Sequence, residues 1–221
     1  MSADLTHVDT WLFDLDNTLY PIESEYMGLI EVRMTDFVER MTGLPREEAR
    51  ALQKKYYTEH GTTLAGLMAY HGLEPKAFLD EVHDVSMDRL VPSAALRAAI
   101  QRLPGRRLIF TNGSLGHAER VLKHLNLRDL FSEIFAIETA DYVPKPSLAT
   151  FDKITKLHAI DPPKTAFFED SEKNLIPAAR LGMTTILVGP HAAASTSEHV
   201  HYRTNDLAEF LNSARLQGSQ A

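Results

Sequence analysis

Two pairs of acidic residues in the chain each directly follow an apolar run. Asp14 and Asp16 follow residues 8–13, and the pair Glu169-Asp170 follows a later run. Two carboxylates separated by one residue face the same way when the chain is extended. One can then attack phosphorus as a nucleophile while the other donates a proton to the leaving oxygen. The competing interpretation is that an aspartate after a strand only forms a turn.

A possible phosphate site follows another apolar run, in the segment Phe-Thr-Asn-Gly-Ser at residues 110–114. This segment opens a predicted helix that contains residues 117–125. The Thr111 hydroxyl, the neighbouring Asn112 and the backbone N–H groups at the start of the helix together suit a phosphate. The alternative is a capped helix start with a turn glycine.

Lys145 stands between Pro144 and Pro146. Each proline fixes its own φ and restrains the residue before it, so the loop that carries Lys145 is stiff. We expect the ammonium to neutralise both the nucleophilic carboxylate and the phosphate. A solvated loop lysine is the alternative.

The late acidic pair suits a magnesium ion, because Mg²⁺ prefers hard oxygen ligands and keeps several waters. The predicted ligands are the side chains of Asp14 and Asp170 and the backbone carbonyl of Asp16. Alternatively, the acids after this run complement a helix dipole, which fits Glu169 better than Asp170. Three further residues are predicted to have auxiliary roles in the site, namely Thr18, Glu169 and Asn174.

The elements that must position these residues form an α/β pattern, in which short apolar runs alternate with amphipathic stretches. This pattern predicts a mostly parallel sheet covered on both faces. Because strand ends converge on one crevice in such a sheet, Asp14, Thr111, Lys145 and Asp170 are expected to meet. The predicted strands are 8–13, 107–110, 134–137, 165–168 and 184–188, and a last helix at 206–215 precedes a frayed tail at 218–221.

A helical segment of residues 21–92 interrupts the α/β pattern directly after the first aspartates. Its predicted helices are 23–41, 46–57, 64–71 and 75–84. We therefore predict a catalytic core of residues 1–20 and 93–221 with a helical insertion between them. An insertion at the catalytic end of a strand hangs over the site as a lid. The alternative is a packing appendage.

Composition excludes several classes of function. With 30 acidic and 23 basic residues the net charge is −7, which opposes binding to a nucleic-acid polymer. The absence of cysteine excludes disulfides, thiolate catalysis and Cys-ligated zinc. No apolar run is long enough to span a bilayer, and the first residues lack the pattern of a secretion signal. We expect a cytoplasmic protein with a small-molecule partner; its oligomeric state stays open.

Four segments, DLDNT, TNG, VPKP and FFEDS, occur in the order of the signature segments of the haloacid-dehalogenase-like (HAD) hydrolase superfamily, which the chain resembles over nearly its whole length. The resemblance implies a Rossmann-like core with a helical cap. It also implies that Asp14 is the phosphorylated nucleophile and Asp16 the acid/base, which enters protonated. By the same resemblance Thr111 and Lys145 bind phosphate, and Asp170 binds Mg²⁺.

A narrower resemblance lies in LFDLDNTLYP, YYTEHGTTLAGLM and FFEDSEKNL, which are similar to pyrimidine 5′-nucleotidase-like phosphatases. It implies a Mg²⁺-dependent hydrolysis of UMP or CMP through an aspartyl-phosphate. The candidate specificity residues in the insertion are Tyr56, His60, Thr62 and Thr63. The alternative is that this stretch is only a helix break followed by an N-cap.

Other functions remain open on the same core. A dehalogenase lacks the second acid, so Asp16 opposes it. A phosphonatase needs a lysine in the insertion, for which Lys54 and Lys55 are candidates. A sugar phosphomutase retains both acids and excludes water from the phosphoenzyme. A non-enzymatic regulatory protein would be expected to have lost a catalytic group, and none is missing.

Overall fold

A six-stranded parallel sheet forms the centre of the computed structural model, which describes residues 2–218. The strand order is β4-β3-β2-β5-β6-β7, so the first strand of this sheet lies in its middle. This arrangement confirms the predicted α/β fold. The strands are β2 (Thr10–Phe13), β3 (Arg106–Phe110), β4 (Glu133–Phe135), β5 (Thr165–Glu169), β6 (Thr184–Val188) and β7 (Tyr202–Thr204).

Helices cover both faces of the sheet. Alternate side chains of β2 point to opposite faces, and every residue of this strand is therefore buried. Trp11 and Phe13 pack in the hydrophobic cluster that includes α5, α6 and α9, whereas Leu12 packs in the cluster that includes α7 and α8. The covering helices are α5 (Ala94–Gln101), α6 (Leu115–His124), α7 (Leu148–Leu157), α8 (Glu172–Arg180) and α9 (Leu207–Ser213).

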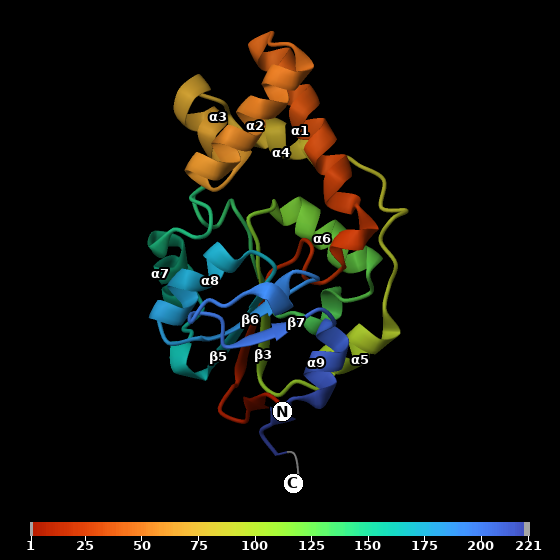
Figure 1. Cartoon of the computed structure of the whole chain (residues 1–221), viewed down its shortest axis with the longest axis vertical. Coiled ribbons are helices and arrows are strands. Elements are labelled where there is room, and N and C mark those ends of the chain that lie inside the picture. Colours follow the sequence, from red (N-terminus) through yellow and green to blue (C-terminus); the bar gives the residue numbers. More distant parts are fainter. Residues whose placement is uncertain (1, 219–221) are drawn as a thin grey trace.

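The helical insertion, residues 21–92, contains α1 (Tyr26–Thr42), α2 (Arg46–His60), α3 (Thr63–His71) and α4 (Pro75–Val82). Figure 1 shows these helices gathered at one end of the molecule. The predicted helices are present. The first begins later than predicted, because Ile22–Ser24 form a short 3₁₀ helix, η1, and Glu25 adopts a left-handed φ of 54°. The division into two domains stays a prediction.

Three short strands escaped the sequence pattern. β7 has the sequence Tyr-Arg-Thr, which lacks the alternation of apolar and polar residues by which a strand is predicted. It lies at the edge of the sheet and is only partly buried. β1 (Asp4–Leu5) and β8 (Arg215–Leu216) form a separate parallel pair. The last helix was therefore predicted too long: it ends at Ser213, and the chain extends at Ala214 to pair with the distant N-terminal segment. Residues 219–221 of the predicted frayed tail lie outside the described residues.

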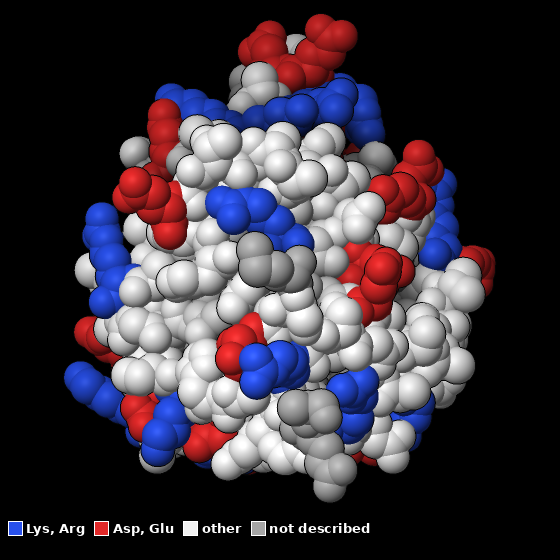
Figure 2. Space-filling view, turned by 60° about the horizontal axis from the view of Figure 1, so that its bottom comes forward, with Lys and Arg blue, Asp and Glu red and all other residues white. Residues whose placement is uncertain are grey.

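Charged side chains of both signs are interspersed over the face of the molecule that Figure 2 presents. Within residues 2–218, none of the helices combines the length and the apolar character needed to cross a bilayer.

Two glycines of the helical insertion give opposite predictions for stability. A Cβ on Gly66 would lie 2.3 Å from Cγ of the buried Tyr56 ring, so Gly66→Ala forces α2 and α3 apart. We expect a loss of about 1–3 kcal/mol, as for other overpacked sites. Gly28 lies in α1 with open space around it, so Gly28→Ala should gain roughly 0.5–1 kcal/mol from helix propensity. Urea unfolding of both variants tests this, and equal stabilities would contradict the packing argument.

Candidate active site

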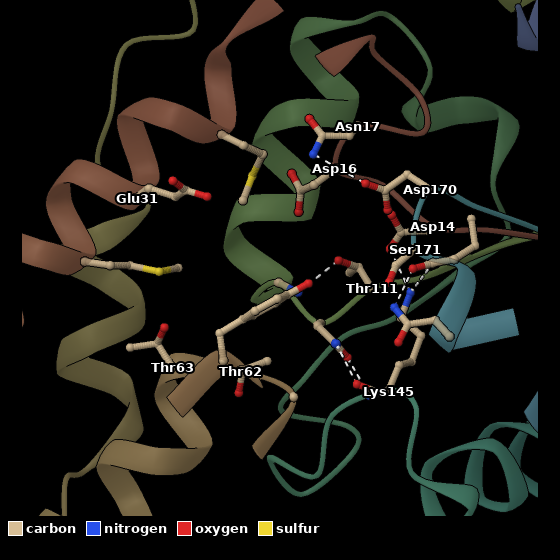
Figure 3. A pocket seen from close by; sticks show the side chains of 18 of the residues that line it. Asp14, Asp16, Asn17, Glu31, Thr62, Thr63, Thr111, Lys145, Asp170 and Ser171 are labelled. Atoms are coloured by element: carbon tan, nitrogen blue, oxygen red, sulfur yellow. Dashed lines mark hydrogen bonds and ion pairs between the residues drawn. The ribbon is translucent and has the colours of Figure 1, made fainter. Parts of the chain in front are cut away.

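The carboxyl ends of β2, β3 and β5 meet at one cavity of about 440 Å³. Phe13 pairs in register with Ile109 on one side and Phe168 on the other, which brings the residues after these strands together. Figure 3 shows the cavity between the strand ends and the helical insertion. The predicted residues that line it are Asp14, Asp16, Thr111, Asn112, Lys145, Glu169, Asp170 and Asn174, and Thr62 and Thr63 from the insertion.

Lys145 lies at the centre of the strand ends, with its side chain only 1% exposed. Its Nζ donates to Asp14 Oδ1 at 2.7 Å, to Glu169 Oε2 at 2.8 Å and to the Phe110 carbonyl at 2.7 Å. Burial alone would lower the pKa of this ammonium, but the two carboxylates raise it above its ordinary value. The lysine is therefore charged and uses all three of its donors on the protein.

The loop of Lys145 is tied to the loop of the predicted phosphate site. Asn112 Oδ1 accepts from the Lys145 backbone N–H at 2.8 Å, and Asn112 Nδ2 donates to the Lys145 carbonyl at 3.2 Å. The Asn112 side chain thus holds the lysine loop in place. The Thr111 hydroxyl oxygen accepts from Gly113 N–H at 2.9 Å, which leaves the hydroxyl proton free to donate to a phosphate oxygen.

Three carboxylates, Asp14, Glu169 and Asp170, offer oxygens that lie within 4.8 Å of one another. Burial and the neighbouring Asp14 raise the pKa of Glu169 to about 8 and the pKa of Asp170 to about 7. Burial also raises the pKa of Asp14, although Lys145 opposes this shift. One ammonium does not balance three carboxylates, so the cluster suits a divalent cation.

The hydrogen bonds indicate which of these acids would hold Mg²⁺. Both Glu169 oxygens are occupied, one by Lys145 and the other by Asn174 Nδ2. Within residues 2–218 Asp170 receives only a long bond of 3.5 Å from Asn17, and Asp14 Oδ2 receives one of 3.3 Å from Thr18. Asp14 and Asp170 thus retain coordinating capacity, while Glu169 orients the lysine. The contribution of the Asp16 carbonyl stays a prediction.

Asp16 differs from these acids because two donors reach one of its oxygens. His117 Nε2 lies 2.8 Å from Asp16 Oδ1, and the Tyr20 hydroxyl donates to the same oxygen at 2.7 Å. Burial would raise the pKa of Asp16, but His117 and Tyr20 lower it below its ordinary value. These donors therefore favour the ionised form of Asp16 in the site without substrate, and the expectation that Asp16 enters the reaction protonated stays a prediction. Sequence spacing could not reveal the donor His117, which lies 101 residues away.

Two of the four predicted specificity residues do not line the cavity. Tyr56 is buried between α2 and α3, where its hydroxyl lies 2.9 Å from His71 Nε2. His60 packs edge-on against Tyr56 and Tyr70. The cavity instead meets another face of α2, which presents Gln53 and Tyr57. The spacing of these two, one helical turn apart, was the available signal for that face.

The insertion also contributes Glu31, Met27 and Met34 from α1 to the cavity wall. In Figure 3, Glu31, Thr62 and Thr63 lie across the cavity from Lys145 and Asp170.

Tyr57 connects the two parts of the cavity wall. Burial raises the pKa of Tyr57, and so do nearby carboxylates, of which Asp170 acts most strongly. The Nζ of Lys173, in α8, lies 4.1 Å from the centroid of the Tyr57 ring, so a cation–π contact joins the insertion to the core. Lys54 also lines the cavity, whereas the other candidate lysine, Lys55, is not part of its wall.

Comparison with known proteins agrees with this geometry. The family model of the haloacid dehalogenase-like hydrolases matches residues 8–182, which include all four signature segments. The chain belongs to this family. It is also 26% identical over 194 residues to "Phosphate metabolism protein 8" of Saccharomyces cerevisiae, a match that covers 80% of the chain. The chain spans about 60% of the length of that relative.

Solved structures share the fold at low sequence identity. A HAD phosphatase from Thermococcus onnurineus gives a TM-score of 0.61 at 18% identity, covering 97% of this chain and 100% of that one. A 2-haloacid dehalogenase from Pseudomonas syringae gives 0.59 at 16% identity, covering 93% and 97%. The HAD-hydrolase YfnB from Bacillus subtilis, bound to magnesium, gives 0.60 at 16% identity, again covering 93% and 97%. Because phosphatase and dehalogenase match alike, the fold does not select the reaction.

The acidic cluster predicts a metal-dependent stability. Mg²⁺ should raise the Tm of the protein after treatment with EDTA, because it offsets the repulsion among the three carboxylates; saturation at 100 times Kd contributes about 2.7 kcal/mol. Asp170→Asn should abolish most of this rise. It should also raise the Tm of the metal-free protein, since it removes one like charge.

Asp152→Asn, on the exposed surface of α7, is the matched control and should retain the full rise. Thermal unfolding with and without Mg²⁺ measures both effects. A rise of the same size in Asp170→Asn and the control would remove Asp170 from the metal site.

Proposed function

We propose that this protein is a Mg²⁺-dependent phosphomonoester hydrolase that forms an aspartyl-phosphate on Asp14. The observation that carries the proposal is the second acid, Asp16, which lines the same cavity as Asp14. A halide leaves carbon as a stable anion and needs no proton, whereas an alkoxide that leaves phosphorus does. Asp16 therefore favours a phosphatase over a dehalogenase.

Asp14 and Asp16 have different roles in the proposed reaction. Asp14 attacks phosphorus, and the P–O bond to the leaving group breaks as the new P–O bond forms. Asp16 gives a proton to the leaving oxygen and then removes one from the water that hydrolyses the aspartyl-phosphate. Because His117 and Tyr20 lower the pKa of Asp16 in the free site, we infer that the approach of the phosphate dianion is what favours its protonated form.

The phosphate is held by donors that the protein has not already used. The Thr111 hydroxyl remains available, as argued above. Lys145 acts chiefly through its charge, since its three donors hold Asp14, Glu169 and the Phe110 carbonyl. Mg²⁺, bound by Asp14 and Asp170, would supply further positive charge at the phosphate.

Trapping of the phosphoenzyme tests the proposed reaction. Asp14→Asn should lower kcat for p-nitrophenyl phosphate by several orders of magnitude, because an amide replaces the nucleophilic carboxylate. Rapid acid quenching should recover labelled phosphate on wild-type protein and none on the variant. Asp152→Asn should behave as wild type. A phosphatase activity that survives in folded Asp14→Asn would overturn the mechanism.

For the substrate we propose a pyrimidine nucleoside 5′-monophosphate. Support comes from Gln53, a buried residue of the cavity wall. Its Oε1 accepts from the Thr35 hydroxyl, which fixes the amide, and within residues 2–218 its Nε2 donates only to the weak acceptor Met34 Sδ, at 3.8 Å. One N–H group of this amide is thus available to a ring carbonyl such as O2 of uracil or cytosine, beside the two methionines of the wall, Met27 and Met34.

A comparison of four nucleotides tests this assignment. UMP and CMP should have a higher kcat/KM than AMP and GMP, and each 1.4 kcal/mol of discrimination corresponds to about tenfold. Gln53→Leu should reduce this preference, whereas Gln101→Leu, on the exposed side of α5, should leave it unchanged. Equal efficiencies for all four nucleotides would reject a pyrimidine substrate and leave the phosphatase mechanism standing.

A phosphomutase shares both aspartates and differs in the acceptor of the phosphoryl group. Release of inorganic phosphate at every turnover, without a bisphosphate activator, would distinguish the hydrolase.

A further inference from the structure

We propose that His117 is a positioning residue that turns one oxygen of Asp16 toward the cavity. The inference rests on the proposed hydrolysis of phosphomonoesters, and it assigns a role to a histidine that is not part of the cavity wall. It follows from how the two oxygens of Asp16 are used.

The two oxygens of Asp16 have different surroundings. Oδ1 accepts from His117 Nε2 at 2.8 Å and from the Tyr20 hydroxyl at 2.7 Å. Both bonds to the carboxylate go to Oδ1, whereas among residues 2–218 no hydrogen bond to Oδ2 is formed. This oxygen lies beside Gly113, where an added Cβ would approach it to 3.4 Å, and Gly113 lines the cavity next to Thr111. Oδ2 is therefore the oxygen that exchanges a proton with the leaving group.

His117 is held so that it can fix Oδ1. Its side chain is 0% exposed, and Nδ1 is buried without a hydrogen-bond partner in the described part of the chain. Its backbone N–H donates to Ser114 Oγ, the N-cap of α6, at 3.2 Å. The contact with Asp16 is thus the one polar interaction of the ring found within the described residues. A side chain that served only to fill space would not need it.

Rings from both ends of the helical insertion pack on His117. His83, at the end of α4, lies with its centroid 4.2 Å from that of His117 and its plane tilted by 16°. Tyr26, the first residue of α1, lies at 6.0 Å with a tilt of 7°. Burial and the nearby His117 lower the pKa of His83 to about 3, so His83 is neutral at pH 7. Both connections of the insertion to the core therefore restrict the His117 ring.

The role predicts a dependence on the leaving group that loss of packing would not produce. The value of kcat/KM reports the first phosphoryl transfer, for which a nucleotide needs a proton on its leaving oxygen and p-nitrophenyl phosphate hardly does. His117→Leu keeps the volume and removes the donor. It should lower kcat/KM for UMP at least about tenfold more than for p-nitrophenyl phosphate, within the range of general acid catalysis.

Two further substitutions test the donor itself. His117→Gln places an amide N–H near the position of Nε2. It should restore most of the ratio of kcat/KM for UMP to kcat/KM for p-nitrophenyl phosphate. His117→Asn is too short to reach Asp16 and should behave as His117→Leu, which keeps the test decisive if the leucine variant does not fold. His124→Leu is the matched control: this histidine of α6 binds the Leu90 carbonyl at 2.9 Å and should leave the ratio unchanged.

The variant Asp16→Asn completes a double-mutant cycle with His117→Leu. If His117 acts through Asp16, its substitution should have little further effect once Asp16 is replaced. Adding His117→Leu to Asp16→Asn should change the ratio less than twofold. Equal losses for both substrates in His117→Leu, or an undiminished effect in the Asp16→Asn background, would overturn the inference. Wild-type protein inactive on both substrates would instead reject the proposed function on which the inference rests.

Discussion

The buried ammonium of Lys145 is the interaction on which the arrangement of the site depends. It joins three strand ends by bonding to Asp14 after β2, to the Phe110 carbonyl of β3 and to Glu169 of β5. Removal of one partner from such a group leaves uncompensated buried charge, which typically costs about 3–5 kcal/mol. The reciprocal bonds of Asn112 hold the lysine loop against the loop after β3. The nucleophile, the phosphate loop and the acidic cluster are therefore fixed relative to one another.

The core and the helical insertion contribute different properties to the cavity. The strand ends supply the charged groups, whereas α1 to α3 supply Glu31, the methionines, Gln53 and the threonines that face them. The cation–π contact between Lys173 and Tyr57 and the rings stacked on His117 join these two parts close to the reacting groups. We infer that movement of the insertion would alter the access of substrate and the alignment of Asp16 together.

Much of the core could be predicted because its signals are local. Apolar runs that end in Asp14, Thr111 and Glu169 indicate both a strand and the polar residue after it, and parallel topology then brings these positions together. The insertion was harder to interpret. Tyr56 and His60 belong to the segment that resembles nucleotidases, yet Tyr56 packs against Gly66 inside the helical insertion. Which side of α2 faces the cavity depends on how the helices pack, and adjacent residues such as Tyr56 and Tyr57 then receive opposite environments.

The sequence by itself indicated the family, the five apolar strands of the sheet and the residues that we propose to carry the chemistry, because residue type and short spacing encode these features. Only the tertiary structure decided how those residues are used. It committed the donors of Lys145 to the protein, left Asp14 and Asp170 with oxygens for a metal, and placed His117 and Tyr20 on Asp16. It also paired β8 with β1 across the whole chain. These outcomes depend on contacts between residues far apart in sequence and on the burial of charge, which no local pattern records.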